Sequence, residues 1–210
     1  MILSVLVPAA MAVLPGPACG RMGRWVLRRR CPDLDVPARW CHPAVAAVWG
    51  CAVSSVSLGD FPPWWLPTQL TTGWLIVLLT GCDLRHRRLP DVLTLGGSAL
   101  VLGALLVAPA LGAPARLPLW GLVGAAVFGG AYATVHLMGP SSLGPGDVKF
   151  AVLLGLAVGG VTPLLVPVVM LGAAVGTLAT AGLLRRRAVP HGPAMALSAW
   201  LVIGTPAWPF

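Results

Sequence analysis

The sequence predicts an all-α fold, a polytopic membrane helix bundle of about eight transmembrane helices, with about six to eight compatible with the pattern. Three observations predict it. Of the 210 residues, 57% are hydrophobic and 10% charged, whereas a soluble domain carries about 25% charged residues. The mean hydropathy is +0.87. Apolar runs recur along the chain, and the basic residues lie between them. A core of this size cannot bury so much apolar surface, so much of it must face lipid.

The apolar runs give the candidate spans. Some are shorter than the ~20 residues that cross about 30 Å of hydrocarbon. The two weakest, 44–58 and 148–162, also fit bent or re-entrant elements. The first run has no basic segment ahead of it, which argues against a cleaved signal peptide. We expect spans near 2–18, 44–58, 66–82, 92–111, 118–138, 148–162, 163–184 and 194–207.

The basic residues support this layout. The net charge is +8, but the charges form short clusters between apolar runs, so we interpret them as membrane topology and expect no nucleic-acid partner. If residues 19–43 face the cytoplasm, the connections alternate between the two faces, and 13 of the 14 basic residues fall inside, as the positive-inside rule requires. Arg116 is the exception. The inside set is Arg21, Arg24, Arg28, Arg29, Arg30, Arg39, Arg85, Arg87, Arg88, Lys149, Arg185, Arg186 and Arg187.

The sizeable polar stretch of the chain is Gly20–His42. Its Arg-rich part, Arg21 to Arg30, is compatible with a short helix on anionic lipid, but we favour a solvated loop that sets the topology. We expect residues 1–65 to be an N-terminal membrane-anchoring segment with this basic cytoplasmic loop. Residues 66–210 would then form the main membrane domain.

The acidic residues are few: the chain has no glutamate and six aspartates. Four have ordinary explanations, since they lie in polar loops or, for Asp91, fit a helix N-cap. The other two, Asp83 and Asp147, stand at span ends, where an ionisable group is costly and is a functional candidate. The loop residues are Asp33, Asp35 and Asp60.

In the predicted topology Asp83 and Asp147 lie at cytoplasmic helix ends, two complete spans apart, so their carboxyls can meet. Two close carboxyls cannot both ionise cheaply, and one keeps a proton while the other activates water, as in aspartic proteases. A helix C-terminus raises a carboxyl pKa and a helix N-terminus lowers it, which favours Asp83 as proton donor and Asp147 as base. Taken singly, Asp147 also fits an N-cap, and Asp83 also fits a partner for its basic neighbours.

Two stretches together are more specific than either alone. Asp83–Asp91 (DLRHRRLPD), followed by Gly144–Lys149 (GPGDVK), resembles the type IV prepilin peptidase family of polytopic aspartyl proteases, whose second motif is GxGD. Val189–Leu197 is similar to the family's late Pro-x-Gly-Pro segment. The motifs follow the family's order, and the resemblance covers roughly residues 66–207.

The resemblance carries roles to individual residues. It implies that Asp83 and Asp147 are the catalytic aspartates. Gly144 and Gly146 match the motif glycines, which allow close backbone approach and unusual φ/ψ beside the carboxyl. Lys149 occupies a position that is often basic in the family, and we class it as supporting.

The resemblance also implies a reaction and a location. The chain would be an aspartic-type endopeptidase whose active site faces the cytoplasm at a bacterial plasma membrane. It would cleave after Gly and so remove the basic leader from prepilin-like precursors of a pilus, secretion or competence system. The expected partners are these membrane proteins and the lipid bilayer, with no cofactor and no metal. Long family members carry paired CxxC motifs that are associated with N-methylation of the mature pilin. The five cysteines of this chain form no CxxC pair, so we expect no N-methyltransferase activity.

Two alternatives remain open at this point. One is a non-catalytic polytopic membrane protein, such as a small permease or an assembly subunit of a pilus or secretion machine, in which buried aspartates serve proton relays. The other is a Ser/His nucleophile made from Ser141 or Ser142 with His136, although a Pro/Gly turn favours a structural role there.

A metal enzyme is a further alternative. Asp83 and His86 stand three positions apart, and His191 and Asp147 are expected on the same face of the membrane, so mixed oxygen and nitrogen ligands are available. The sequence contains no HExxH or comparable spacing, which disfavours this alternative.

Overall fold

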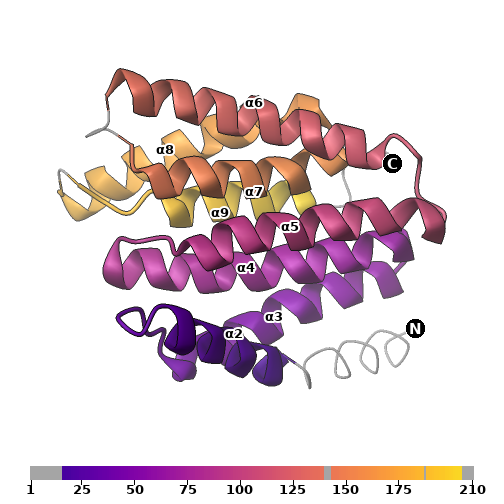
Figure 1. Cartoon of the computed structure of the whole chain (residues 1–210), viewed down its shortest axis with the longest axis horizontal. Coiled ribbons are helices and arrows are strands. Elements are labelled where there is room, and N and C mark those ends of the chain that lie inside the picture. The colour runs from indigo at the N-terminus through magenta and orange to yellow at the C-terminus, as the bar shows by residue number, and fades with distance from the viewer. Residues whose placement is uncertain (1–15, 140–142, 187, 205–210) are drawn as a thin grey trace.

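The computed structural model describes residues 16–139, 143–186 and 188–204, and every regular element in these ranges is helical (Figure 1). The predicted all-α bundle is confirmed. The predicted span at 2–18 lies almost wholly outside the described residues. The helices are α2 (Gly16–Arg30), α3 (Ala38–Ser57), α4 (Leu66–His86), α5 (Asp91–Val107), α6 (Leu117–Met138), α7 (Pro145–Val161), α8 (Val166–Leu184) and α9 (Gly192–Ile203), with short 3-10 turns at Pro63–Trp65, Ala108–Leu111 and Pro163–Leu165.

Among the residues that the structure describes, three helical segments are long and apolar enough to cross a membrane: Asp91–Leu111, Leu117–Met138 and Pro163–Leu184. At most 33% of the apolar window in each is buried within the protein. Their remaining apolar surface therefore suits lipid, and the chain is a membrane protein.

The helix α7, which begins with the GxGD motif, lies at the centre of the bundle and contacts α4, α5, α6 and α9. From Phe150 to Val161 all its residues except Val152 are buried. Its 17 residues fall short of the ~20 that match the hydrocarbon thickness. Because neighbouring helices cover α7, its length need not match the thickness of the lipid hydrocarbon. This explains why 148–162 was one of the two weakest predicted spans.

Facing glycines bring α6 and α7 unusually close. A Cβ added at Gly155 would lie 2.6 Å from the carbonyl oxygen of Gly124, and one added at Gly159 would lie 2.8 Å from the Cα of Gly124. Small residues allow this approach between membrane helices. A side chain at these positions would meet the backbone of the facing helix and push α6 away from α7.

The Arg-rich segment forms α2, so the expected solvated loop at Arg21–Arg30 is wrong. The helix packs against α3 and α4. Its Leu27 is fully buried, and its Gly23 lies against α4, since a Cβ added there would be 3.2 Å from Cζ2 of Trp74. The indole N–H of Trp74 also donates to the carbonyl oxygen of Cys19 at 3.0 Å. Tertiary packing of this kind stabilises a short helix whose composition alone suggests a loop.

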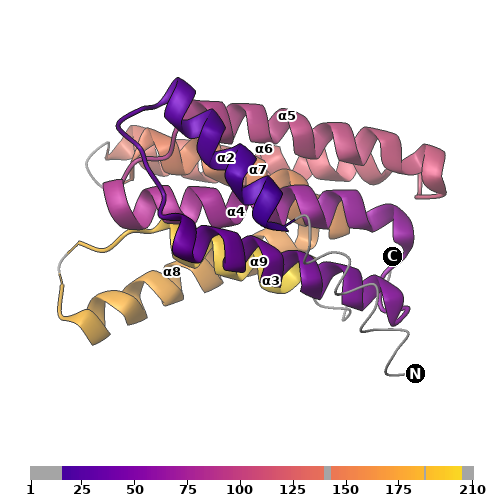
Figure 2. The same ribbon diagram turned by 90° about the horizontal axis from the view of Figure 1, so that it is seen from below.

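Successive helices run in opposite directions. The C-terminal ends of α2, α4, α6 and α8 and the N-terminal ends of α3, α5, α7 and α9 therefore lie at one end of the bundle, on the left in Figures 1 and 2. The clusters Arg28–Arg30, Arg85–Arg88 and Arg185–Arg186 belong to this end, whereas Arg116 precedes α6 at the opposite end. This is the separation of basic residues that the predicted topology requires.

Candidate active site

Asp83 lies in the last turn of α4 and is 6% exposed. The helix ends because Arg87 adopts the left-handed conformation (φ 51°, ψ 37°), and its N–H donates to the carbonyl oxygen of Asp83 at 2.9 Å. A left-handed cap satisfies the last carbonyls and stops a helix. The Asp83 carboxyl is thus held one turn before the chain leaves toward α5.

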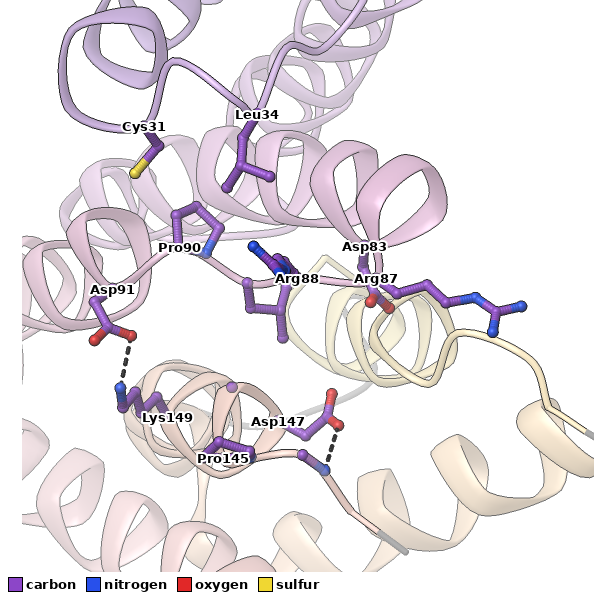
Figure 3. A pocket seen from close by; sticks show the side chains of 13 residues that line it. Cys31, Leu34, Asp83, Arg87, Arg88, Pro90, Asp91, Pro145, Asp147 and Lys149 are labelled. Carbon is purple, nitrogen blue, oxygen red and sulfur yellow. Dashed lines mark hydrogen bonds and ion pairs between the residues drawn. The ribbon is translucent and has the colours of Figure 1, made fainter. Parts of the chain in front are cut away.

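Asp147 lies in the first turn of α7 at the third helical position, so the alternative that it is an N-cap is wrong. Gly144 is the N-cap residue, and Pro145 takes the first helical position, where a missing N–H is harmless. The N–H of Gly144 donates to Oδ2 of Asp147 at 3.3 Å (Figure 3). The carboxyl therefore folds back over the helix start, as an acid at this position of a capping box does.

The two motif glycines allow close packing because they lack a side chain, and their backbone dihedral angles are ordinary. Gly144 has φ −72° and ψ 150°, which any residue can adopt, and neither motif glycine is among the described residues with positive φ. The expected unusual φ/ψ is therefore wrong, but the expected close approach is present. A Cβ at Gly144 would lie 3.3 Å from Oδ2 of Asp147, and one at Gly146 would lie 3.1 Å from Cβ of Leu89.

Both aspartates line one pocket of about 340 Å³ at the basic end of the bundle (Figure 3). Asp83 enters it from α4 and Asp147 from α7, which are separated in sequence by α5 and α6. Figure 3 shows the two carboxyls on opposite sides of this space. The other lining residues are Cys31, Leu34, Arg87, Arg88, Leu89, Pro90, Asp91, Gly144, Pro145, Gly146 and Lys149.

The two carboxyls have unlike surroundings, and both lie outside the three apolar spans. Burial, followed by the negative charge of Asp147, raises the pKa of Asp83, while a hydrogen bond from Gly192 and the charges of His191 and Arg87 oppose the rise. Burial also raises the pKa of Asp147, opposed by the hydrogen bond from Gly144. Both pKa values are therefore raised, that of Asp83 partly by the charge of Asp147, which is the condition under which two neighbouring carboxyls share one proton.

Lys149 forms an ion pair across the pocket wall. Its Nζ lies 2.6 Å from Oδ1 of Asp91 and joins α7 to α5 (Figure 3). Asp91 is the first residue of α5 and Pro90 is the N-cap, so the expected N-cap role of Asp91 is wrong. The Asp91 carboxylate instead binds the lysine that follows the motif.

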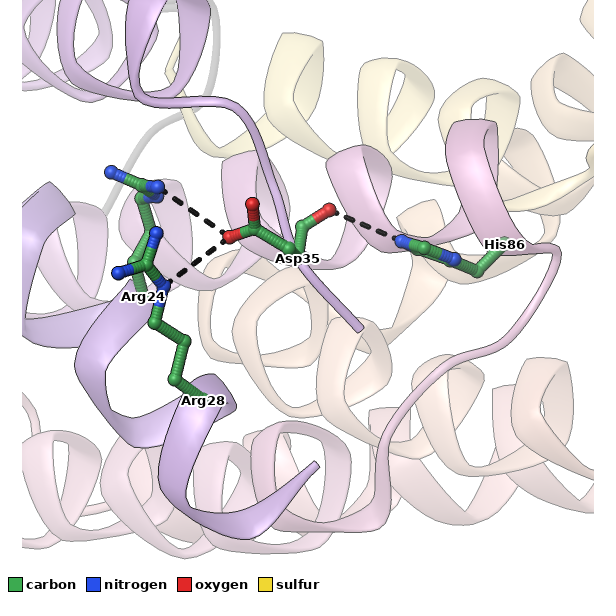
Figure 4. Close-up of polar contacts among 4 residues, drawn as sticks. All are labelled: Arg24, Arg28, Asp35 and His86. Atoms are coloured by element: carbon green, nitrogen blue, oxygen red, sulfur yellow. Dashed lines mark hydrogen bonds and ion pairs between the residues drawn. The ribbon is translucent and has the colours of Figure 1, made fainter. Parts of the chain in front are cut away.

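The connection between α2 and α3 supplies two residues of the pocket wall, Cys31 and Leu34. Asp35 anchors this connection, since its Oδ1 lies 3.4 Å from Nη2 of Arg24 and 3.6 Å from Nε of Arg28 (Figure 4). Nε2 of His86 lies 3.1 Å from the carbonyl oxygen of Asp35, so it donates the proton (Figure 4). The wall is thereby tied to both α2 and α4.

The segment before α9 contacts the first aspartate directly. The N–H of Gly192 donates to Oδ2 of Asp83 at 3.0 Å. Residues 189–197 were predicted only to resemble a family segment, and no role was predicted for Gly192. A glycine between His191 and Pro193 at a helix start was the available signal, because such a site exposes an N–H with no side chain beside it.

The residues of the two other candidate sites have other contacts. His86 binds the Asp35 backbone, and both ring nitrogens of His191 lie at hydroxyl groups. Nδ1 of His136 lies 2.7 Å from the carbonyl oxygen of Leu143 and donates to it, a bond that joins the last turn of α6 to the residue just before Gly144. Ser141 and Ser142 lie outside the described residues.

Comparison with known proteins shows the family of the chain. Residues 69–182 match the model of the type IV leader peptidase family. The chain is 29% identical over 194 residues to the prepilin leader peptidase/N-methyltransferase of Aeromonas hydrophila, covering 84% of this chain and 62% of that one. It is 35% identical over 136 residues to the protein of the same name from Xanthomonas campestris pv. campestris, covering 60% and 46%. The chain thus spans less than two thirds of the length of these relatives, and no solved structure matches it significantly. The match over more than half of its length shows that the chain belongs to the type IV leader peptidase family.

Proposed function

We propose that the chain is a membrane-embedded aspartic endopeptidase that removes the basic leader peptide from prepilin-like precursors. One observation carries the proposal. Asp83 and Asp147 come from helices separated by two others, and they line the same pocket. Membership of the family supports it, as do relatives that are named prepilin leader peptidase/N-methyltransferase.

The two carboxyls would divide the chemistry. Asp147, as carboxylate, takes a proton from a water while the water oxygen attacks the carbonyl carbon of the scissile peptide. Asp83 gives its proton to the carbonyl oxygen, which produces a tetrahedral diol. Asp147 then protonates the leaving nitrogen, the C–N bond breaks, and one diol hydroxyl returns a proton to Asp83. One water is consumed, and the pair regains its starting protonation.

The hydrogen bonds support this division. Among the described residues they account for one oxygen of each carboxyl, from Gly192 on Asp83 and from Gly144 on Asp147. The second oxygen of each group is left for water and substrate. The charge of Asp147 contributes to the raised pKa of Asp83, which favours Asp83 as the group that keeps the proton.

The supporting residues would keep the pair in place. Gly144 and Gly146 admit close contacts with Asp147 and Leu89. Lys149, through Asp91, fixes the start of α7 to the start of α5. We also propose that residues 66–210 form the peptidase domain. Residues 1–65 anchor the protein in the membrane and, in addition, contribute Cys31 and Leu34 to the wall of the pocket.

The arrangement of charge supports a location. The pocket is lined by residues at the end of α4 and the start of α7, which is the end of the bundle that carries the arginine clusters. By the positive-inside rule this end lies on the cytoplasmic side of the bacterial plasma membrane. A precursor whose apolar helix lies in the bilayer would present its short leader there, and an acidic residue near the scissile bond would be attracted by Arg87 and Arg88.

Co-expression with a prepilin tests the function. The substrate has a basic leader that ends in Gly, and leader removal is read as a mobility shift on an immunoblot. We expect cleavage by the wild type and by Asp60→Asn, whose exposed residue lies at the opposite end of the bundle. We expect none by Asp83→Asn or Asp147→Asn, with each variant present in the membrane at wild-type levels. Processing that survives both substitutions would leave a non-catalytic membrane component as the better account.

A further inference from the structure

His191 immediately precedes α9, and its ring lies between α6 and α8. Its Nε2 is 2.8 Å from the hydroxyl of Tyr132, and its Nδ1 is 2.6 Å from Oγ1 of Thr177. The ring also stacks on Tyr132, with centroids 5.7 Å apart and planes at 23°. Two helices therefore hold one imidazole by both nitrogens and by one face.

The protons of this cluster can be assigned. The hydroxyl of Thr177 donates to the carbonyl oxygen of Ala173 at 2.8 Å. A hydroxyl has one proton, so Oγ1 of Thr177 can only accept from His191. Nδ1 of His191 therefore carries the ring proton, and Nε2 accepts from the hydroxyl of Tyr132. Burial lowers the pKa of His191, opposed by the charge of Asp83, in keeping with a neutral ring.

The cluster continues to Asp83 through one peptide group. The carbonyl oxygen of His191 accepts the N–H groups of Ala194 and Met195, at 3.1 and 3.2 Å, so His191 fixes the start of α9. The next N–H along the chain is that of Gly192, which donates to Oδ2 of Asp83. We propose that His191 is a positioning residue: Tyr132 and Thr177 fix its ring, and the fixed ring aims the N–H of Gly192 at Asp83.

This proposal rests on the proposed function and adds to it a group that controls the pKa of Asp83. The N–H of Gly192 stabilises the ionised form of Asp83. Loosening His191 should weaken that bond, so that Asp83 keeps its proton to higher pH. The other charged groups that act on Asp83 are Asp147 on α7 and Arg87 at the end of α4, and variants at Thr177 or Tyr132 retain both of these side chains.

Paired variants on α8 test the proposal. Thr177→Val keeps the shape but removes the acceptor for Nδ1–H, whereas Thr177→Ser keeps the hydroxyl. The matched control is Thr180→Val, because Thr180 donates to the carbonyl oxygen of Gly176 at 2.7 Å in the same way but is exposed. Cleavage of a prepilin by purified protein would be measured as kcat and KM across pH.

The expected result is specific to positioning. Thr177→Val should lower kcat by about tenfold or more with KM nearly constant, and should move the alkaline limb of the pH profile upward. Thr177→Ser should restore both, and Tyr132→Phe should reproduce the defect. Unchanged kcat and pH profile in folded Thr177→Val or Tyr132→Phe would overturn the proposal.

A measurement on the wild type covers the case in which the variants do not fold. The 15N resonances of His191 should show a protonated Nδ1 and an unprotonated Nε2 over the pH range of activity. A protonated Nε2, or a doubly protonated ring in that range, would overturn the assignment. If the wild type cleaves no prepilin at all, the proposed function fails instead, and the two failures are thus distinguishable.

Discussion

The N–H of Gly192 reaches Oδ2 of Asp83 at 3.0 Å although 109 positions separate the two residues. A Cβ added at Gly192 would lie 2.7 Å from the same oxygen. The start of α9 therefore fits against the carboxyl so closely that only a residue without a side chain can supply the bond. This contact connects the late segment of the chain to the first aspartate.

Gly192→Ala should abolish leader cleavage, by a factor of about 100 or more, because the methyl group displaces the Asp83 carboxyl. The matched control is Gly130→Ala on α6, where an added Cβ meets nothing within 4 Å. It should cleave at the wild-type rate. The measurement is the initial rate of cleavage at equal amounts of membrane-inserted protein. Wild-type activity in Gly192→Ala would show that the close contact has no role in catalysis.

Asp83→Asn should stabilise the protein near neutral pH. The folded pKa of Asp83 is raised, so its ionised form opposes folding at every pH above the ordinary aspartate value, and this effect disappears in more acidic solution. Asparagine removes the charge and keeps an oxygen to accept from Gly192. We expect a melting temperature in detergent higher by about 2 °C or more at neutral pH, with the difference vanishing toward about pH 4.

The same melting curves on Asp60→Asn provide the reference, since this aspartate is exposed and lies at the other end of the bundle. A lower melting temperature for Asp83→Asn than for the wild type at neutral pH would contradict the raised pKa of Asp83.

The fold class could be predicted from the sequence because composition and charge spacing report directly on lipid contact. Both aspartates could be selected as candidates, since an acid at a span end is conspicuous in a chain with so few acids. Gly192, Tyr132 and Thr177 were not predicted to lie near the pair. Their roles depend on which faces of α6, α8 and α9 meet, and helices this uniformly apolar carry no periodic signal to indicate those faces.

Local rules also failed at two places near the pocket. The α2 segment appears as a loop by composition because its arginines hide the contact that Leu27 and Gly23 make with the bundle. Asp91 was predicted as an N-cap because the residues near it in sequence do not indicate that its partner is Lys149, 58 positions away. Both are tertiary contacts that override local preference.

The pH profile of cleavage should be bell-shaped. The acid limb reports the ionisation of Asp147, and the alkaline limb reports loss of the proton held by Asp83. Burial raises both pKa values, so both limbs should lie above the ordinary range of aspartate. The measurement is kcat/KM against pH with a soluble leader-containing substrate. A carboxyl-resolved titration in which Asp147 keeps its proton to higher pH than Asp83 would reverse the two roles.

Arg85→Cys and Asp60→Cys, each in a background without the native cysteines, should be labelled from opposite sides of the membrane. Both positions are exposed, and they belong to opposite ends of the bundle. An impermeant thiol reagent applied to intact cells should label only the cysteine at 60, and cell lysis should expose the cysteine at 85. Labelling of both from outside would contradict a cytoplasmic pocket.

A double-mutant cycle on the cleavage rate tests most directly whether the two acids form one catalytic unit. Asp83→Asn, Asp147→Asn and the double variant should all fall to the same background, a loss of about 1,000-fold or more, because removing either member disables both. If either single variant retains substantial cleavage, or if the losses add in the double variant, the acids act independently and the shared-proton mechanism is wrong.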